Sequence, residues 1–261
     1  MYDGLHWRGS RMKMRSAVAI PARLKSSRLP EKVLVDIAGK TMLERTYDVA
    51  VQADIGPVLV LTDSEQVADT VRSFGGQVLM TGAELESGTA RIASVADTIE
   101  ADVVVNLQGD APLTDPGVIA EGAREAAASQ APVTMPVYRI TRPEDVQDPS
   151  VVKVIRGHDG RTLYCSRSPV PHVRDEPLLN WPESARFWGH VGLYAYSHDF
   201  LRRFEGLAVS PLERSERLEQ LRWLEAGLRL HTFEVEPQGP SVDTPGQLER
   251  VRTAFLEGTL R

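Results

Sequence analysis

The chain has 261 residues and a formal net charge of -6 at pH 7, which disfavours a nucleic-acid-binding protein because such proteins normally carry a basic excess. Its length is sufficient for one large α/β domain, or for one domain with a small lobe, around a sizeable core. The single cysteine excludes an internal disulfide and fits a reducing cytoplasm, and no run of 18 apolar residues predicts a membrane span.

Residues 1–15 are predicted to be a disordered or non-native N-terminal tail. They are rich in basic residues, but no apolar segment of the signal-peptide type follows, because Pro21 and Arg23 interrupt it. Met12 and Met14 are alternative start positions. Regular patterning begins at Ser16, so we expect residues 16–261 to form a single domain.

Strands and helices alternate from residue 16 to about residue 130. Short apolar runs predict strands, and apolar residues at helical spacing predict helices. The predicted order is strand 16–21, helix 41–53, strand 57–61, helix 64–74, strand 77–80, helix 87–99, a strand from 103 and helix 116–129. This alternation is typical of an α/β fold with a doubly wound, mostly parallel sheet.

The second half of the chain has a different pattern. It predicts strand 133–140, strands 151–156 and 162–166, strand 190–196, helix 210–226, strand 229–235 and helix 245–256. The turn residues His158-Asp159-Gly160 predict a β-hairpin between residues 151 and 166. This hairpin and the Trp/Pro-rich loop 169–188 are expected to form a small β-rich lobe, roughly within residues 133–196.

The loop after the first strand carries four basic side chains within ten residues: Arg23, Lys25, Arg28 and Lys32. Clustered like charges repel one another unless an anion lies among them, and Arg and Lys together suit a polyphosphate. The alternative is a solvated basic loop. Two common phosphate motifs are excluded, because Leu34 replaces the first glycine that a Walker A loop would need before Gly39-Lys40-Thr41, and no Gly-x-Gly-x-x-Gly follows a strand.

A carboxylate follows the apolar strand that starts at Val103, in the sequence Gln108-Gly109-Asp110. Ligands of open α/β sheets bind at the carboxyl ends of strands, so Asp110 is placed to hold a metal ion. Asp243 lies two residues before a proline-started helix, and the two carboxylates together suit Mg²⁺ when substrate phosphates complete its coordination. The alternatives are a turn residue for Asp110 and a helix cap for Asp243.

A third candidate is Ser87-Gly88-Thr89-Ala90-Arg91, at a predicted helix start. Its hydroxyl groups, exposed backbone N–H groups and arginine could hold a nucleotide base or ribose. The alternative is an ordinary helix cap.

Five ordered motifs together resemble those of the 3-deoxy-manno-octulosonate cytidylyltransferase (CMP-KDO synthetase) family, over about Ser16 to Phe255. They are Ile20-Pro21-Ala22-Arg23 continuing to Arg28-Leu29-Pro30-x-Lys32, Thr62-Asp63, Ser87-Gly88-Thr89-x-Arg91, Gln108-Gly109-Asp110-x-Pro112, and Val242-Asp243-Thr244-Pro245. The resemblance implies a nucleotidyltransferase-A (Rossmann-like) fold, a homodimer, Mg²⁺ as cofactor, and transfer of CMP from CTP to an acidic acceptor with release of pyrophosphate.

The resemblance also implies a role for each matching residue. Arg23, Lys32 and Asp110 would be catalytic, and Asp110 and Asp243 would hold the metal. The nucleotide would contact Ala22, Arg23, Arg28, Lys32, Thr62, Asp63, Ser87, Gly88, Arg91 and Gln108. The acceptor would contact Arg167, His190, Tyr194, Glu219 and Gln220. The residues alone leave other readings open. His190 and Tyr194 could be a core pair on one strand face, and Glu219 and Gln220 could be helix surface.

One residue departs from the family pattern. The family usually has Gln-Gly-Asp-Glu-Pro at the metal strand, where this chain has Ala111 in place of the glutamate. The missing carboxylate would ease the approach of a more anionic acceptor. The acceptor is therefore either 3-deoxy-manno-octulosonate or a different acid, such as a phosphonate of the phosphonoformate type. A catalytically weak CTP-binding regulatory protein is the alternative from another class.

Overall fold

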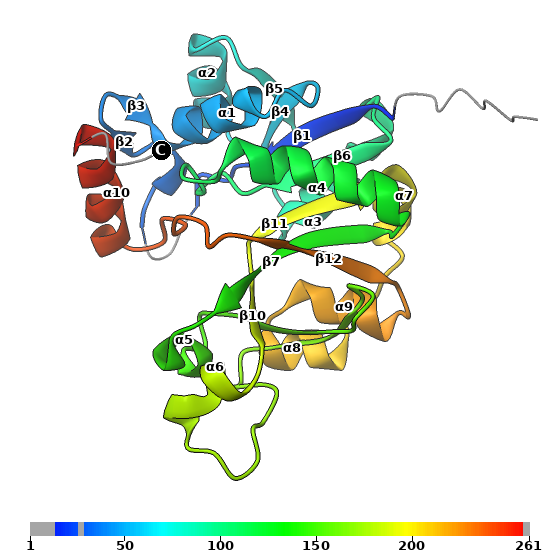
Figure 1. Cartoon of the computed structure of the whole chain (residues 1–261). Coiled ribbons are helices and arrows are strands. Elements are labelled where there is room, and N and C mark those ends of the chain that lie inside the picture. The colour runs from blue at the N-terminus through cyan, green and yellow to red at the C-terminus, as the bar shows by residue number, and fades with distance from the viewer. Residues whose placement is uncertain (1–13, 26–28, 258–261) are drawn as a thin grey trace, which may run out of the picture.

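The computed structural model describes residues 14–25 and 29–257. Most of the predicted N-terminal tail and the predicted triphosphate ligand Arg28 therefore lie outside the described residues. One large twisted sheet forms the middle of the molecule, with helices on both faces of its upper half and a smaller lobe at its lower end (Figure 1). Within the described ranges, no helix has the length and apolarity needed to cross a bilayer.

The sheet has ten strands, with the order β5-β4-β1-β6-β11-β7-β10-β8-β9 and with β12 paired to β7. The strands are β1 (Ser16–Pro21), β4 (Val58–Thr62), β5 (Gln77–Met80), β6 (Val103–Leu107), β7 (Val133–Ile140), β8 (Lys153–Arg156), β9 (Thr162–Ser166), β10 (Phe187–His190), β11 (Leu193–Ser197) and β12 (Leu230–Val235). The pairs β5-β4, β4-β1, β1-β6 and β12-β7 are parallel. The parallel half confirms the predicted α/β class and aligns the carboxyl ends of β1, β4 and β6 at one edge.

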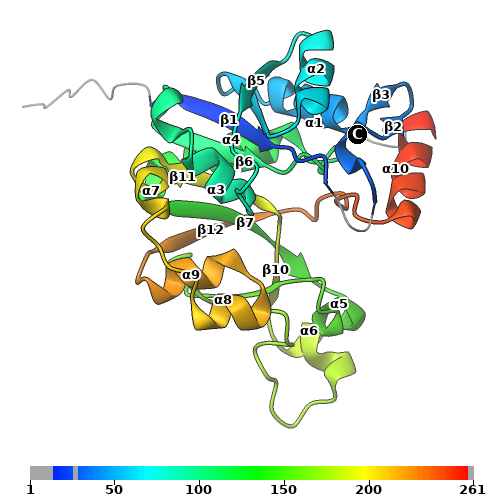
Figure 2. The same cartoon turned by 180° about the vertical axis from the view of Figure 1, so that it is seen from behind.

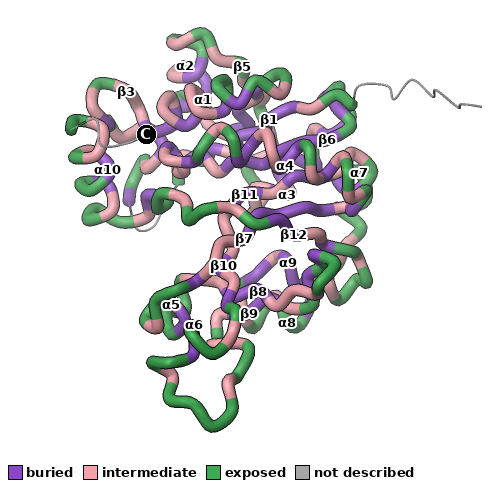
Figure 3. The backbone as a smooth tube through the Cα atoms, viewed as in Figure 1, coloured by how far each residue is buried: buried purple, intermediate pink, exposed green. Residues whose placement is uncertain are grey.

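Helices cover both faces of the parallel strands, which explains why these strands are apolar at consecutive positions. On one face α1 (Met42–Gln52), α2 (Glu65–Ser73) and α4 (Pro116–Ser129) bury Val18, Ile20 and Val105. On the other face α3 (Gly88–Ala93), α7 (His198–Phe204) and α9 (Glu219–Glu225) pack around Ala19 and Val104. Figure 2 shows α3, α7 and α9 on this second face. The buried tube segments in Figure 3 follow the strands between the two helix layers.

Several predicted boundaries are confirmed at their first or last residue. β5, β7 and α4 span the predicted residues, and Thr41, Ser64 and Ser87 are side-chain N-caps of α1, α2 and α3. Each cap accepts a hydrogen bond from a backbone N–H three residues later, which satisfies a donor that the helix itself leaves unpaired.

Three predicted elements were wrong in length. The helix expected over 87–99 ends at Ala93 and continues as the 3-10 turn Ala96–Thr98, which turns Ala96 and Ile99 into the core. The strand expected over 190–196 is two strands, because β10 pairs with β7 and β8 while β11 pairs with β6 and β7. His190 and Tyr194 thus belong to different strands, which corrects the prediction that one strand face carries both.

The helix expected over 210–226 was also wrong. It is divided into α8 (Pro211–Glu216) and α9 at Arg217, whose φ of 52° ends α8 in the left-handed region. α8 buries none of its residues, whereas Leu218 and Leu221 pack against Met135 and Val154. The break lets the chain turn this apolar side toward the sheet.

The antiparallel part of the sheet carries the small lobe. β8 and β9 form the predicted hairpin, and β10 joins this hairpin to β7, so the hairpin extends the main sheet. α5 (Pro143–Gln147), the 3-10 turn Leu178–Asn180 and α6 (Trp181–Ser184) lie beside it at the lower end of the molecule (Figure 1). Trp181 and Phe187 stack at 6.0 Å between ring centroids and anchor this lobe.

The sequence predicted the helix near the carboxyl end but not the small elements that pack against it. The 3-10 turn Lys32–Leu34 and the two-stranded ribbon β2 (Asp36–Ile37) and β3 (Lys40–Thr41) lie against α10 (Pro245–Glu257). Ile37, Met42, Val242, Leu248 and Val251 form their shared apolar cluster. This layer brings the segment that carries Asp243 next to the loop that carries Lys32.

Gly56 is the glycine at which a side chain is least tolerated. Its φ is +146°, and a Cβ there would lie 2.0 Å from the backbone oxygen of Ser16, at the start of β1. We expect Gly56→Ala to lower the free energy of unfolding by at least about 2 kcal/mol, since backbone strain and a backbone clash add. Gly246, in α10, has open space around its Cβ position, so Gly246→Ala should change stability by no more than about 1 kcal/mol. Urea unfolding of both variants measures the difference, and equal effects would contradict the prediction.

Candidate active site

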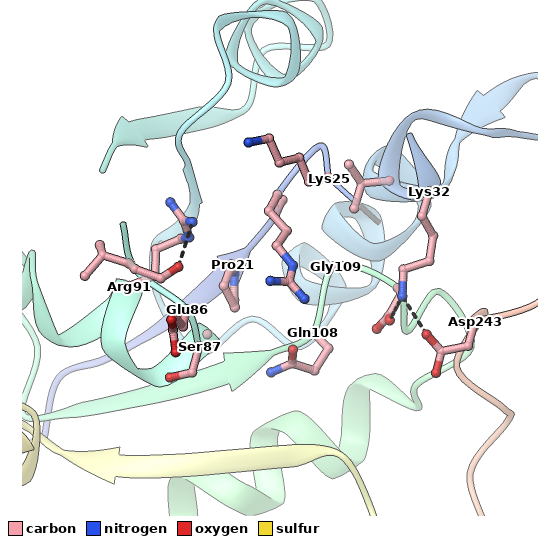
Figure 4. A pocket seen from close by; sticks show the side chains of 15 residues that line it. Pro21, Lys25, Lys32, Glu86, Ser87, Arg91, Gln108, Gly109 and Asp243 are labelled. Carbon is pink, nitrogen blue, oxygen red and sulfur yellow. Dashed lines mark hydrogen bonds and ion pairs between the residues drawn. The ribbon is translucent and has the colours of Figure 1, made fainter. Parts of the chain in front are cut away.

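A pocket of about 200 Å³ lies at the carboxyl ends of β1 and β6, where the parallel strands end (Figure 4). Its lining comes from the segment after β1, the segment that starts α3, the segment after β6 and the segment before α10. The lining residues are Pro21, Ala22, Arg23, Lys25, Lys32, Val33, Leu85, Glu86, Ser87, Gly88, Arg91, Gln108, Gly109, Asp110 and Asp243. Four of the five predicted motifs thus meet in one place, as expected for ligand binding at this edge of an α/β sheet.

Lys32 joins the two predicted metal ligands. Its Nζ donates to Asp110 Oδ2 and to Asp243 Oδ1, the latter at 2.8 Å (Figure 4). The side chains of Lys32, Asp110 and Asp243 are 15%, 20% and 30% exposed. The burial of Lys32 favours its neutral form, but the charges and hydrogen bonds of Asp110 and Asp243 outweigh this effect and raise the pKa of Lys32.

The backbone fixes the two carboxylates relative to each other. The N–H of Val242 donates to the carbonyl oxygen of Asp110 at 2.9 Å, which ties the segment before α10 to the segment after β6. Gln247, in the first turn of α10, accepts from the backbone N–H groups of Asp243 and Thr244. The two aspartates are 133 residues apart in the sequence, and a backbone hydrogen bond between their segments brings them together at Lys32.

Arg23 and Lys25 are exposed and line the same pocket as Lys32. Their positions support the predicted polyphosphate site, because the basic side chains face an open cavity rather than acidic partners on the surface. The glycines keep this cavity open: a Cβ at Gly88 would meet Pro21 Cγ at 2.9 Å, and one at Gly109 would lie 3.2 Å from the Pro21 oxygen.

Arg91 reaches the pocket, but its guanidinium is largely used to hold the neighbouring loop. It donates to the Thr81 hydroxyl and to the carbonyl oxygens of Gly82 and Leu85, and it lies 3.7 Å from Asp63. Thr62 is buried and accepts from the backbone N–H of Ser64. Thr62 and Asp63 do not line the pocket, so the structure gives them a supporting position behind it.

A second pocket, of about 720 Å³, adjoins the first and shares Gln108 and Asp110 with it. Ala111, Tyr138, Arg139, Arg142 and His190 are among its other lining residues. The shared residues show where a group bound in the second pocket would meet a nucleotide bound in the first. The sequence motifs did not indicate Arg139, which lies within the predicted strand 133–140, or Arg142, which lies two residues after it.

Of the five residues predicted to contact the acceptor, one lines the second pocket and four line neither pocket. His190 lines the second pocket. Arg167 lies elsewhere and donates to the carbonyl oxygens of Glu216 and Pro149, at 2.7 and 2.8 Å. Gln220 donates to the Tyr194 hydroxyl, and both side chains are enclosed in the core against α9. Neither Tyr194 nor Gln220 lines either pocket, and Gln220 is buried, contrary to the helix-surface reading.

Glu219 is partly buried and its carboxylate is turned toward the start of α3, contrary to the helix-surface reading. Its carboxylate oxygens accept from Ser87 Oγ at 2.7 Å and from Thr89 Oγ1 at 2.6 Å. Burial raises the pKa of Glu219, although the two hydroxyl donors act in the opposite direction. Glu219 thus supports the start of α3 from behind the pocket.

His190 is predicted to make the stability depend on pH. Burial lowers its pKa to about 4 from an ordinary value of 6.5, and its buried Nε2 has no hydrogen-bond partner among the described residues. Between these two pH values the unfolded chain binds a proton at His190 and the folded chain does not. The free energy of unfolding is therefore unaffected by His190 above pH 6.5 and falls as the pH is lowered toward 4. The loss attributable to His190 should be of order 2–3 kcal/mol at pH 4. Urea unfolding of the wild type and His190→Gln at pH 7 and 4.5 measures it, and parallel losses would contradict the assignment.

The donor set for a divalent cation is small. Among the described residues, no group of three or more His, Cys, Asp or Glu side chains could enclose a metal ion. Asp110 and Asp243 supply two carboxylates at the rim of a pocket with basic side chains. This set fits a hard cation such as Mg²⁺, which takes one or two carboxylates and completes its shell with substrate phosphates and water.

Comparison with known proteins decides the family. Residues 17–230 match the model of the cytidylyltransferase family. The chain is 44% identical over 245 residues to the 3-deoxy-manno-octulosonate cytidylyltransferase of Solibacter usitatus, covering 93% of this chain and 95% of that protein. The chain belongs to the 3-deoxy-manno-octulosonate cytidylyltransferase family. It is therefore a nucleotidyltransferase enzyme, as the motifs predicted.

Two further comparisons agree with this family. The 3-deoxy-manno-octulosonate cytidylyltransferase of Escherichia coli is 43% identical over 247 residues, covering 93% of this chain and 97% of that protein. A solved structure of CMP:2-keto-3-deoxy-manno-octonic acid synthetase complexed with CTP has a TM-score of 0.88 and 40% identity, covering 94% of this chain and 99% of that chain. A putative glucose-1-phosphate thymidylyltransferase of Bacillus anthracis, at 17% identity and a TM-score of 0.62, shares the fold.

Proposed function

We propose that this enzyme transfers CMP from CTP to 3-deoxy-manno-octulosonate and releases pyrophosphate. The observation that carries the proposal is the pair of adjoining pockets that share Gln108 and Asp110, one with basic side chains at a strand edge and one larger. Nucleotide in the first pocket and sugar acid in the second would meet at Asp110. The family relationship supports these two substrates.

The basic side chains have a defined part in this reaction. The acceptor oxygen attacks the α-phosphorus of CTP in line with the departing pyrophosphate, and negative charge develops on the phosphoryl oxygens. Arg23, Lys25 and Lys32 line the pocket and would bind the triphosphate, together with Arg28. Positioning and charge stabilisation supply most of the catalysis in such a transfer, and no covalent enzyme intermediate is required.

Asp110 and Asp243 would hold Mg²⁺, which supplies charge neutralisation at the phosphates when it is bound. In the structure their oxygens contact the Lys32 ammonium, so a cation already lies between them. When triphosphate oxygens arrive, Lys32 can exchange a carboxylate contact for a phosphate contact. The two aspartates then become available as metal ligands.

The remaining proposals concern the setting of the enzyme. We propose that residues 16–261 act as a single catalytic unit, that the enzyme is a homodimer, and that it works in the cytoplasm. The family resemblance supports the dimer. Cys165, the single cysteine of the sequence, is buried as a thiol, which supports a reducing compartment.

A second acceptor class is kept as an alternative because of Ala111. This residue lines the larger pocket beside Asp110, where a glutamate would add a negative charge. A more anionic acid, such as a phosphonate, meets less repulsion at this position.

An acceptor panel tests these alternatives. Purified enzyme with CTP and Mg²⁺ is incubated with 3-deoxy-manno-octulosonate, with phosphonoformate and with related acids, and the CMP conjugates are identified by mass spectrometry. Formation of the CMP conjugate of 3-deoxy-manno-octulosonate and no other product supports the main proposal. Preferential use of a phosphonate supports the alternative, and CTP binding without pyrophosphate release from any acceptor indicates a regulatory protein.

A further inference from the structure

A chain of hydrogen bonds through the core connects α9 with Gln108, one of the two residues shared by the two pockets. Four side chains form it, and we refer to them as the Glu219 chain: Glu219, Thr89, Tyr196 and Asn106. The links are Thr89 Oγ1 to Glu219 Oε2 at 2.6 Å, Thr89 Oγ1 to Tyr196 Oη at 2.8 Å, and Asn106 Nδ2 to Tyr196 Oη at 3.2 Å. Gln108 Nε2 then donates to Asn106 Oδ1 at 2.9 Å. The chain ends at Gln108, which lines both pockets.

The carboxylate fixes the direction of the first links. Both oxygens of Glu219 accept, one from Ser87 Oγ and the other from Thr89 Oγ1, so Thr89 donates its single hydroxyl proton to Glu219. Thr89 Oγ1 can then only accept from Tyr196, which in turn uses the single proton of its phenol.

The direction of these donors also determines how the amides of Asn106 and Gln108 are oriented. Because the Tyr196 oxygen has no proton left to give, it accepts from Asn106, so the nitrogen of the Asn106 amide faces Tyr196 and its oxygen faces Gln108. Only the nitrogen of Gln108 can donate to that oxygen. The nitrogen and oxygen positions of the Asn106 and Gln108 amides agree with this direction.

Because the Gln108 nitrogen donates to Asn106, the oxygen of the same amide is available to accept from a ligand. In Figure 4 this oxygen is turned toward the middle of the pocket and the nitrogen is turned away from it. A carbonyl oxygen at this place accepts a hydrogen bond from a hydroxyl and repels the oxygens of phosphates and carboxylates. A Gln108 amide turned by 180° would have the opposite preference.

We infer that the Glu219 chain consists of positioning residues, which hold the Gln108 amide oxygen toward the boundary of the two pockets so that it accepts a hydrogen bond from a hydroxyl of the acceptor. This role rests on the proposed function, because it places the acceptor in the larger pocket. It also gives Glu219 a task different from the direct acceptor contact that the motif comparison predicted. Tyr196, Thr89 and Asn106 are buried and touch neither pocket, so their effect on the reaction passes through Gln108.

A double-mutant cycle tests the inference. Tyr196→Phe removes the phenol oxygen and keeps the ring, so Gln108 loses its fixed orientation. We expect kcat/KM for the acceptor to fall at least about 10-fold while the KM for CTP changes less than about 2-fold. In a Gln108→Ala background the same Tyr196→Phe change should have less than about a 2-fold effect, because the group that it orients is gone. An equal fold-change in both backgrounds would overturn the inference.

Two further variants separate positioning from loss of structure. Thr89→Ser keeps the hydroxyl and should retain activity within about 3-fold, whereas Thr89→Val breaks the chain and should match Tyr196→Phe. Tyr47→Phe is the matched control, because its phenol accepts from the Gln77 backbone N–H outside both pockets. Thermal melting of each variant monitors folding, and equal activity of the two Thr89 variants would count against the inference.

The side-chain amide signals of Gln108 in a ¹⁵N NMR spectrum provide a readout that needs no acceptor. They are assigned by their absence in Gln108→Ala. We expect Tyr196→Phe and Thr89→Val to shift them and Thr89→Ser and Tyr47→Phe to leave them in place. Unchanged signals in Tyr196→Phe would overturn the inference even if the wild type makes the expected product. A wild type that makes no product from 3-deoxy-manno-octulosonate refutes the proposed function, and the NMR result then decides the inference alone.

Discussion

Asp110→Asn is expected to lower kcat at least about 100-fold, measured as pyrophosphate release with CTP and saturating acceptor. The substitution keeps the size of the side chain and removes its charge. Asp110 lies at the point where the two pockets meet, and it contacts Lys32 Nζ. The variant therefore loses a proposed metal ligand and the partner that orients a basic side chain toward the triphosphate.

Asp115→Asn is the control for this variant. Asp115 follows Asp110 in the same connecting segment and caps α4 through its hydrogen bond with the Gly117 N–H. Asparagine caps helices as well as aspartate does, so this variant should keep near-normal activity and stability. Near-normal pyrophosphate release by Asp110→Asn would remove Asp110 from the centre of the reaction.

Lys32→Met is expected to change catalysis and metal binding in opposite directions. Without the ammonium group, kcat/KM for CTP should fall about 100- to 1000-fold, because a main partner of the triphosphate charge is lost. Asp110 and Asp243 would both lose the contact with the ammonium group that now joins them. Repulsion between the two carboxylates favours any cation that replaces Lys32, so Mg²⁺ should bind the nucleotide-free variant more tightly than the wild type.

Isothermal titration with Mg²⁺ and steady-state kinetics measure the two effects. Lys40→Met is the matched control, because Lys40 also contacts two carboxylates, Glu44 and Asp48, but lies outside both pockets. This control should leave both quantities within about 2-fold of the wild type. Weaker Mg²⁺ binding in Lys32→Met would show that Lys32 supports the metal site rather than competing for it.

The two pockets explain why a change of acceptor could leave the nucleotide chemistry intact. Arg23, Lys25 and Ser87 line the smaller pocket alone, whereas Ala111 and His190 line the larger pocket alone. A substitution at Ala111 would alter the charge seen by the acceptor without touching the basic side chains. Asp110, in the motif that indicates the reaction, and Ala111, which bears on the choice of acceptor, are thus neighbours in the sequence. Asp110 lines both pockets, whereas Ala111 lines only the larger one.

The parallel half of the fold was predictable because its signals are local. The central strands β1 and β6 are buried and largely apolar, and each helix start there carries a Ser or Thr cap or a proline. Two of the three wrong predictions, the strand 190–196 and the helix 210–226, fall in the antiparallel half. Periodicity alone does not reveal that His190 ends one strand while Leu193 begins another, because the partners that separate them, β8 and β6, are distant in sequence.

The candidate site shows a similar division. The residue types around Arg23, Ser87 and Asp110 by themselves indicate a nucleotide pocket. Glu219 and Gln220 were assigned to the acceptor from their motif, but their hydrogen bonds turn them toward Ser87, Thr89 and Tyr194. A motif match states which residue is present, and its direction depends on the neighbours that compete for its polar atoms.

The sequence by itself determined the family, the parallel sheet and the basic and acidic residues of the nucleotide site, because these depend on residue type and local spacing. Only the tertiary structure decided that Asp243 meets Asp110 across Lys32, that two pockets share Gln108, and that Glu219 lies beneath them. These features depend on contacts between segments that the chain separates by more than a hundred residues. Such contacts are stabilised by the burial and pairing of groups brought together by the whole fold, and no local pattern encodes them.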